Sequence, residues 1–318
     1  MKLSSLYKKA ISVGIENDPR GKDAVAMELE DTKKRYDDMK PKEKDSFDME
    51  YLENPYSDSR LLVGSGDEEI SSMMIGIDID VGEITLAEIL RGKGNKIDML
   101  MSHHPGGIAF GNLFSVMYMQ AEILRTNGVP INIAEALTEG RMKEVERRLM
   151  PANHTRAVDA ARLLNFPFMC MHTAGDNMVA TYLQRLFEEK NPSRLEDVLD
   201  LLLDISEYKD AVKYNAGPKL LIGPEKRKAG KIFVDMTGGT EGAKDIFSSL
   251  TLSGVNTIVG MHMSEEHRKE AELHHLNVII AGHIASDNLG LNLLLDKTLA
   301  GEQINIVECS GFRRIARG

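Results

Sequence analysis

The chain has 318 residues, which is enough for one large domain or two ordinary ones with a sizeable core. Hydrophobic residues make up 42% of it and charged residues 28%, a balance typical of a soluble globular protein without a disordered half. The formal net charge of -10 argues against nucleic acid as a partner, because neutralising phosphates requires a surplus of Lys and Arg.

The cysteines and the apolar segments restrict the cellular setting. Cys170 and Cys309 lie far apart and match neither a disulfide framework nor a zinc ribbon. No apolar stretch approaches the roughly 20 residues that span a bilayer, and the first residues do not lead into a signal-peptide core. We therefore expect a cytoplasmic protein in a reducing compartment, with no membrane partner.

The N-terminal part predicts helices and the rest predicts alternating elements. Residues 4–45 form a helical pair in this prediction, with a break at 18–21, and the polar segment 40–59 forms a loop or linker. From residue 70 onward, apolar runs alternate with amphipathic segments, which predicts an α/β fold. In this first half we expect strands at 73–79, 97–102 and 166–172, a short apolar piece at 129–133, and helices at 83–92, 113–126, 139–164 (broken at Pro151), 179–189 and 195–203.

The same rhythm restarts near residue 218. Here we expect strands at 218–223, 231–234, 257–261 and 278–281, and helices at 243–250, 264–273 and 289–299. Because each half contains a strand that ends in histidine, the pattern hints at a duplicated unit.

The segment Ser102-His103-His104-Pro105 places two adjacent histidines at the end of an apolar run. Adjacent side chains of an extended chain point to opposite sides, so both imidazoles face one centre only if the backbone turns there. Pro105 and the two glycines that follow it favour such a turn. A lone His-His pair is more often hydrogen-bonded than metal-bound, so the metal interpretation requires further ligands.

Two further motifs supply such ligands. The motif from His172 to Asp176 follows the apolar run 166–171, and the motif from His283 to Asp287 follows the run 277–282. If a helix begins at His283, Asp287 stacks on the same face four residues later. Parallel sheets bind ligands beyond the carboxyl ends of their strands. We therefore expect one such edge to carry His103, His104, Asp176 and His283.

Three imidazoles and two carboxylates exceed what one closed tetrahedral zinc site needs, whereas two ions that share a carboxylate use all of them. The residues therefore predict a dinuclear site. Mixed nitrogen and oxygen ligands fit zinc, manganese, iron, cobalt or nickel, so the metal stays open. Because paired ions activate water and stabilise developing charge, hydrolysis is the leading class of reaction.

Other polar residues permit two interpretations each. Asp78, at the end of the strand expected at 73–79, is either a catalytic or supporting residue of the site or ordinary turn chemistry before Gly82. The glycine-rich turn at 235–242 either cradles a phosphate at a helix N-terminus or only connects a strand to a helix. Five histidines show no convincing partners in the sequence: His154, His262, His267, His274 and His275.

Together these motifs resemble the Nif-three-like family, whose members are often labelled GTP cyclohydrolase I type 2 homologues. The match covers residues from about 54 to 300 and comprises, in order, Ser59-Arg60-Leu61-Leu62-Val63-Gly64, Ile75-Gly76-Ile77-Asp78 and the three histidine motifs. The resemblance implies two similar interlocked α/β lobes with an added N-terminal helical segment. The corresponding division is 1–53 for the helical extension and linker, 54–190 for the first lobe and 191–318 for the second lobe, which completes the metal site.

The resemblance also implies a ligand set and an assembly. Two divalent metal ions are expected per chain, bound between the lobes by His103, His104, Asp176, His283 and Asp287. A ring-like homo-oligomer, commonly a hexamer, is expected as well. The chain departs from the family pattern in three places. The last ligand is Asp287 where glutamate is usual, Tyr56-Ser57-Asp58 replaces an aromatic-Asp-Asn run, and residues 134–165 lengthen the interval between the first two motifs.

Two functions from different classes follow. The first is a metal-dependent hydrolase of a nucleotide-like or phosphorylated small molecule, which uses metal-bound hydroxide and Asp78 or another group as proton shuttle. GTP ring opening is implied by the resemblance alone. The second is a non-catalytic metal-binding regulatory or scaffold assembly, because a closed site presents the same ligands. A scaffold whose histidines have lost their metal is the remaining alternative.

Overall fold

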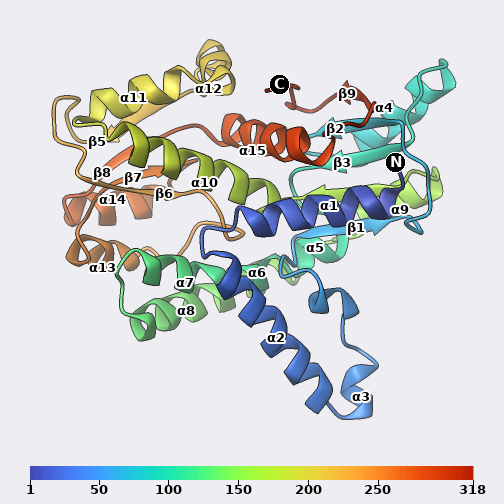
Figure 1. Ribbon diagram of the computed structural model, residues 1–318, viewed down its shortest axis with the longest axis horizontal. Helices are drawn as coiled ribbons and strands as arrows, with labels where there is room; N and C mark the ends of the chain where they lie inside the picture. Colours follow the sequence, from blue (N-terminus) through green and yellow to red (C-terminus); the bar gives the residue numbers. More distant parts are fainter. Residues whose placement is uncertain (318) are drawn as a thin grey trace.

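Two mixed β-sheets surrounded by helices build the computed structural model, which describes residues 1–317 (Figure 1). The first sheet has the strand order β1-β4-β3-β2-β9 and the second the order β5-β8-β7-β6. β1 and β5 run antiparallel to their neighbours, and the other pairs are parallel. The strands are β1 (Ser59–Val63), β2 (Ser72–Gly76), β3 (Met99–Ser102), β4 (Phe168–Met171), β5 (Lys219–Ile222), β6 (Lys231–Asp235), β7 (Val255–Gly260), β8 (Asn277–Ile280) and β9 (Asn305–Glu308).

The orders β1-β4-β3-β2 and β5-β8-β7-β6 repeat one arrangement, in which the first strand lies antiparallel beside the last. This repetition supports the duplicated unit suggested by the sequence, and the α/β class is confirmed. β9 then returns to the first sheet and pairs in parallel with β2. The last strand of the predicted second lobe, 191–318, therefore lies in the sheet of the first lobe.

The central strands were predictable and two edge strands were not. β2, β3 and β4 are apolar runs that are buried along their whole length, as expected of parallel strands covered on both faces. β1 and β9 lie at the two edges of the first sheet and are partly exposed. Short, half-buried edge strands carry little apolar periodicity, so the sequence analysis did not predict them.

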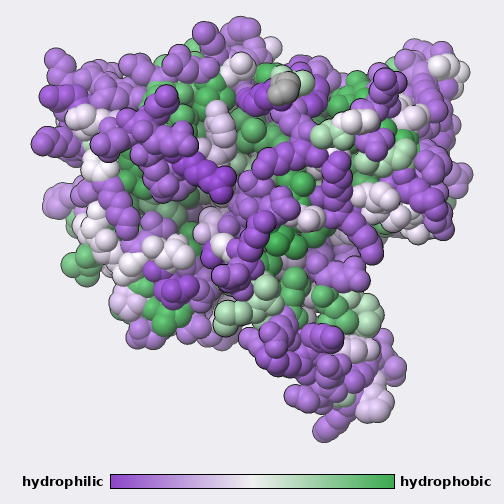
Figure 2. Space-filling model, in the orientation of Figure 1, coloured by the Kyte–Doolittle hydropathy of each residue, from purple (hydrophilic) through white to green (hydrophobic). Residues whose placement is uncertain are grey.

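The predicted N-terminal helical pair is confirmed as α1 (Leu3–Glu16) and α2 (Lys22–Asp38). α1 buries one apolar face against α10 and α15, so it belongs to the body of the protein. α2 has only Val25 buried, and it projects from the body together with α3 (Pro41–Lys44) (Figure 1). The surface of this projection is largely hydrophilic (Figure 2). The predicted loop at 40–59 contains α3 and the short helix η1 (Met49–Leu52).

The remaining helices cover the sheets. They are α4 (Val81–Gly92), α5 (Gly107–Gly111), α6 (Leu113–Val116), α7 (Met119–Thr126), α8 (Ile131–Leu149), α9 (Arg156–Leu163), α10 (Thr173–Lys190), α11 (Leu195–Leu203), α12 (Ser206–Ala211), η2 (Val212–Tyr214), α13 (Ile246–Leu252), α14 (Glu265–Leu273) and α15 (His283–Thr298). The expected helix at 113–126 is two helices, α6 and α7, and the apolar piece at 129–133 leads into α8. Across residues 1–317, no helix is both long and apolar enough to cross a bilayer.

α10 and α15 hold equivalent places in the two repeats, directly after β4 and β8, and they pack side by side. A Cβ atom at Gly290 of α15 would lie 2.5 Å from the carbonyl oxygen of Gly175 in α10. Only glycine at position 290 permits this approach of the two backbones. The packing therefore brings the N-terminal turns of both helices together between the sheets.

Candidate metal centre

The first sheet supplies two adjacent histidines where β3 ends. The backbone turns after Ser102, where the amides of His103 and His104 donate to the carbonyl oxygen of Ile77 at 3.1 and 2.9 Å. Both imidazoles then face one centre, with ring centroids 5.3 Å apart. The predicted backbone turn is therefore present, and it solves the problem that neighbouring side chains of a strand point apart.

The two packed helices add one histidine and one aspartate each. His172 immediately precedes α10 and Asp176 lies in its first turn, while His283 begins α15 and Asp287 follows one turn later. The four-residue spacing places the members of each pair on one helix face. Both helices begin earlier than the predicted positions 179 and 289, because their first turns consist of small and polar residues without helical apolar spacing.

These side chains converge around the buried carboxylate of Asp287. His103 Nε2 lies 3.4 Å from Asp287 Oδ1 and 3.3 Å from Asp176 Oδ1. The other oxygen, Asp287 Oδ2, lies 3.4 Å from His104 Nε2 and 3.7 Å from His283 Nε2. Three overlapping groups have ligand atoms within 4.8 Å of one another, namely His103-His104-His172, His104-His283-Asp287 and His103-Asp176-Asp287.

Four buried polar atoms at this centre have no hydrogen-bond partner within the described chain: His103 Nε2, Asp176 Oδ1 and both carboxylate oxygens of Asp287. Buried polar groups are nearly always satisfied, and a buried carboxylate without a partner is strongly unfavourable. Imidazole nitrogens and carboxylate oxygens together are ligands for divalent transition metals. The residues therefore fit a metal ion, and the sequence-predicted set of His103, His104, Asp176, His283 and Asp287 lies together.

The imidazoles of the first sheet are held at their other nitrogen. His103 Nδ1 lies 3.1 Å from the carbonyl oxygen of Met171, and His104 Nδ1 donates to Asp78 Oδ1 at 2.7 Å. A hydrogen bond at Nδ1 fixes the tautomer and the ring orientation and leaves Nε2 to face the centre. Both rings are therefore held with Nε2 toward the centre.

His172 is held in the same way by Asp58, a residue to which the sequence assigned no role at the site. Its Nδ1 donates to Asp58 Oδ2 at 2.8 Å, and its Nε2 faces Asp176 Oδ2 at 3.9 Å. Asp58 is fully buried and also accepts from the Thr173 hydroxyl at 2.7 Å. His172 therefore joins the candidate ligands, although only Asp176 of its motif was predicted to be one.

Burial and the neighbouring charges set the protonation states. Burial lowers the pKa of His103 to about 3, so its imidazole is neutral near pH 7. Burial raises the pKa of Asp176 to about 6. At His104 burial disfavours the charged form, but the contacts with Asp287 and Asp78 outweigh it and raise the pKa to about 10. A metal that binds His104 Nε2 must therefore displace a proton.

Asp78 lies at the rim of the centre, with 63% of its side chain exposed. The hydrogen bond from His104 lowers the pKa of Asp78 and keeps the carboxylate ionised. Asp78 borders a cavity of about 620 Å³ that is also bordered by five of the candidate ligands, His104, His172, Asp176, His283 and Asp287. Its observed contact orients His104, and its catalytic role stays a prediction.

The second sheet contributes a histidine to the same cavity. His262 follows β7, borders the cavity, and has its ring centroid 4.9 Å from that of His283. The interpretation that His262 has no partner was therefore wrong. His154 and His267 also have partners, since they contact the carbonyl oxygens of Leu149 and Gly242 away from the ligands.

The glycine-rich turn at 235–242 borders the cavity but does not lead directly into a helix. α13 begins only at Ile246 and has seven residues, so of the two interpretations of this turn the structure favours a simple connection between a strand and a helix over a phosphate cradle at a helix N-terminus. Gln120 of α7 holds the turn instead, because its Nε2 donates to the carbonyl oxygens of Gly238 and Thr240, both at 2.7 Å.

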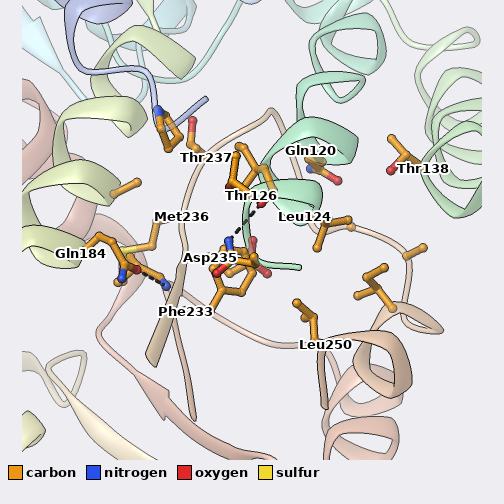
Figure 3. Close-up of a pocket in the computed structure, with 18 of the residues that line it drawn as sticks. Gln120, Leu124, Thr126, Thr138, Gln184, Phe233, Asp235, Met236, Thr237 and Leu250 are labelled. Atoms are coloured by element: carbon orange, nitrogen blue, oxygen red, sulfur yellow. Dashed lines mark hydrogen bonds between the residues drawn. The ribbon is translucent and has the colours of Figure 1, made fainter. Parts of the chain in front are cut away.

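A second cavity of about 290 Å³ adjoins the first and shares Asp235, Met236 and Thr237 with it. Figure 3 shows these residues at the end of β6, between Gln120 and Gln184. Apolar side chains of α7, β6 and α13 complete the walls. Asp235 is exposed to solvent. Desolvation by the protein that surrounds its carboxyl group nevertheless raises the pKa of Asp235 to about 6.

The chain is similar to several solved structures. The NIF3 superfamily protein from Sphaerobacter thermophilus matches with a TM-score of 0.70 and 29% identity over 80% of this chain and 91% of that chain. Reduced HcgD from Methanocaldococcus jannaschii matches with a TM-score of 0.49 and 15% identity over 80% and 89%. A Bacillus cereus protein related to NIF3 matches with a TM-score of 0.39 and 11% identity over 80% and 91%. No family model matches the chain, and no curated protein does.

Proposed function

Since the chain is a Nif-three-like protein with the fold of the NIF3 superfamily, we propose that it binds two divalent metal ions and hydrolyses a nucleotide-like or phosphorylated small molecule. The observation that carries this proposal is the convergence of four buried ligand atoms that have no hydrogen-bond partner within residues 1–317. These atoms belong to His103, Asp176 and Asp287. A cation bound at this centre compensates all four atoms at once, whereas the hydrogen bonds of residues 1–317 leave them without partners.

Two ions are favoured over one because the two oxygens of Asp287 face different partners. Oδ1 faces His103, whereas Oδ2 faces His104 and His283. One carboxylate is thus placed to contribute to two ligand groups, the first completed by Asp176. When bound, two such ions lower the pKa of water and stabilise negative charge on a phosphoryl or carbonyl oxygen.

The residues around the ligands supply the other requirements of a hydrolase. The cavity of about 620 Å³ admits a small molecule to the exposed side of the centre. Asp78 is ionised, borders this cavity and is hydrogen-bonded to His104. It therefore orients a ligand and is available to accept a proton from the reacting water.

The first test is metal content per chain, measured by elemental analysis of protein purified without chelator or affinity metal. We expect about two ions, which the double variant His103→Ala/His104→Ala loses while its circular dichroism stays native. The double variant His274→Ala/His275→Ala is the matched control, because this adjacent histidine pair follows α14 away from the cavity. Absence of metal after reconstitution of the wild type, or equal metal content in both variants, contradicts the proposal.

The second test is hydrolysis by the metal-loaded protein, with GTP and other phosphorylated small molecules as substrates. Turnover that is lost in His103→Ala/His104→Ala supports the hydrolase. Two retained ions with no turnover across the panel would instead favour a non-catalytic metal-binding regulatory or scaffold assembly. We further propose a homo-oligomer, commonly a hexamer in this family, and the molar mass from light scattering tests it.

A further inference from the structure

One face of α8 turns toward the metal cavity and carries two arginines. Arg141, Val145, Arg148 and Leu149 all border this cavity. Their spacing of three, four and seven residues places them on one side of the helix. The cavity is therefore lined by the candidate metal ligands and by a cationic helix face that the proposed metal chemistry does not use.

Two contacts fix the position of Arg141, and they involve only Nε and Nη1 of its guanidinium group. Its Nε donates to the carbonyl oxygen of Glu241 at 3.0 Å and its Nη1 pairs with Glu144 at 2.7 Å, which leaves the side chain 13% exposed. Its Nη2 makes neither of these two contacts. Arg148 is 69% exposed and forms an ion pair with the same Glu144, at 3.8 Å. Two guanidinium groups therefore share one carboxylate.

Most acidic side chains of the cavity have other partners. Asp176 and Asp287 belong to the proposed metal centre, and Asp78 is bound to His104. The carboxylate of Glu241 accepts from the Ser264 amide at 2.8 Å. Asp235, the remaining acid, lies at the junction with the second cavity. Within residues 1–317 no lysine borders the metal cavity, so the fixed positive charge of its described lining comes from Arg141 and Arg148.

We propose that the cavity takes an anionic small molecule whose phosphate or carboxylate group is held by Arg141 and Arg148 while another part of it reaches the metal centre. A guanidinium presents a planar fork of N–H donors that matches the oxygens of a phosphate or carboxylate. Arg141 is pre-oriented for this contact and Arg148 adds charge from the next turns of the helix. This inference rests on the proposed function for the reaction itself, but anion binding by the arginines is measurable without turnover.

The test compares anion binding by the wild type and by arginine variants of the full chain, in its metal-loaded and metal-free forms. The probes are inorganic phosphate, citrate, adenosine 5′-monophosphate and adenosine, titrated by calorimetry. Arg141→Gln/Arg148→Gln removes both charges, and Arg148→Gln alone is the variant that leaves the contact between Arg141 and Glu241 intact. Arg147→Gln is the matched control, because it changes the same charge on the same helix outside the cavity lining.

We expect at least one anionic probe to bind the wild type and Arg147→Gln tenfold or more tightly than the double variant, with an intermediate affinity for Arg148→Gln. Adenosine, which is neutral, should show no such dependence. Stronger binding of phosphate or of citrate identifies which anionic group the arginines prefer. Equal binding of every anion by the wild type and the double variant, or no binding by either, overturns the inference. Metal content of each variant separates this failure from that of the metal centre.

Discussion

Asp58 offers the sharpest test of how the candidate centre is built, because it contacts no proposed ion and acts only through His172. Its carboxylate accepts from His172 Nδ1 at 2.8 Å, from the Thr173 hydroxyl at 2.7 Å and from the Thr173 amide at 3.3 Å. Burial opposes its charge, but the hydrogen bonds from His172 and Thr173 and the charge of His172 together outweigh burial and lower the pKa of Asp58. Asp58→Asn keeps the volume of the side chain and replaces one acceptor oxygen by a donor.

The expected effect has two parts. If the new amide faces His172 Nδ1 or the Thr173 hydroxyl, two donors meet, and one or two charge-assisted hydrogen bonds are lost at about 1.5–3 kcal/mol each. We therefore expect the free energy of unfolding to fall by about 2–4 kcal/mol. Loss of the group that orients a ligating histidine typically weakens metal binding by about 10- to 100-fold.

Asp98 provides the matched control for this measurement. Its Oδ2 also accepts three hydrogen bonds, from the amide and hydroxyl of Ser71 and from the amide of Ser72, at 2.9 to 3.0 Å. It lies outside the metal cavity. Urea unfolding and calorimetric titration with Mn²⁺ or Zn²⁺ should show that Asp98→Asn loses stability alone, whereas Asp58→Asn loses stability and metal affinity. Unchanged affinity in Asp58→Asn refutes the assigned role of Asp58.

The further predictions concern protonation and packing. Metal binding at pH 8 should release about one proton per chain, because contacts with Asp287 and Asp78 raise the pKa of His104 to about 10 and the ligating form of His104 is neutral. Calorimetric titrations in buffers of different ionisation enthalpy measure this proton release. Metal binding without proton release contradicts the role of His104 as a ligand. In the metal-free protein, the raised pKa of His104 adds to the free energy of unfolding. This contribution is complete below about pH 6.5 and is lost as the pH rises toward 10. His104→Gln should therefore flatten the pH dependence of urea unfolding in this range. Gly290→Ala should destabilise the protein by about 1–3 kcal/mol through its clash with Gly175. Gly140→Ala, where an added Cβ meets nothing within 4 Å, should stabilise it by about 0.5–1 kcal/mol, and equal effects would exclude the clash.

The ligand motifs were predictable because their chemistry is local. Two adjacent histidines before a proline and two His-x-x-x-Asp segments are visible in the sequence itself. The partner of His172 was not predictable, since Asp58 is 114 residues away and meets it only through the pairing of β1 with β4. The return of β9 to β2 depends in the same way on contacts between distant segments.

His262 shows a signal that the sequence did contain. β3 and β7 hold the same place in the two sheets, and His104 and His262 each lie two residues after the end of their strand. The duplicated order of strands, once applied residue by residue, places His262 beside the centre. Without that register His262 had no convincing partner in the sequence.

Asp287 is one methylene shorter than the glutamate that is usual at this position in the Nif-three-like family. Its carboxylate nevertheless belongs to both ligand groups, the one with His103 and the one with His104. Its oxygens lie 3.4 Å from His103 Nε2 and from His104 Nε2, and the side chain is fully buried. The close packing of α10 and α15 explains the short acid, because Gly290 allows α15 to approach within contact of Gly175.

Asp287→Glu should therefore weaken metal binding, since the longer side chain must fold back inside a fully buried space. Gly290→Ala forces the two helices apart and withdraws position 287, so it should weaken binding by the wild-type aspartate as well. The longer glutamate compensates for that withdrawal. The double variant should therefore lose less metal-binding free energy than the two single variants lose together. Calorimetric titration of all four proteins gives this coupling energy. Strict additivity would show that helix spacing and acid length are independent, and unimpaired binding by Asp287→Glu alone would show that the space around position 287 does not select the shorter acid.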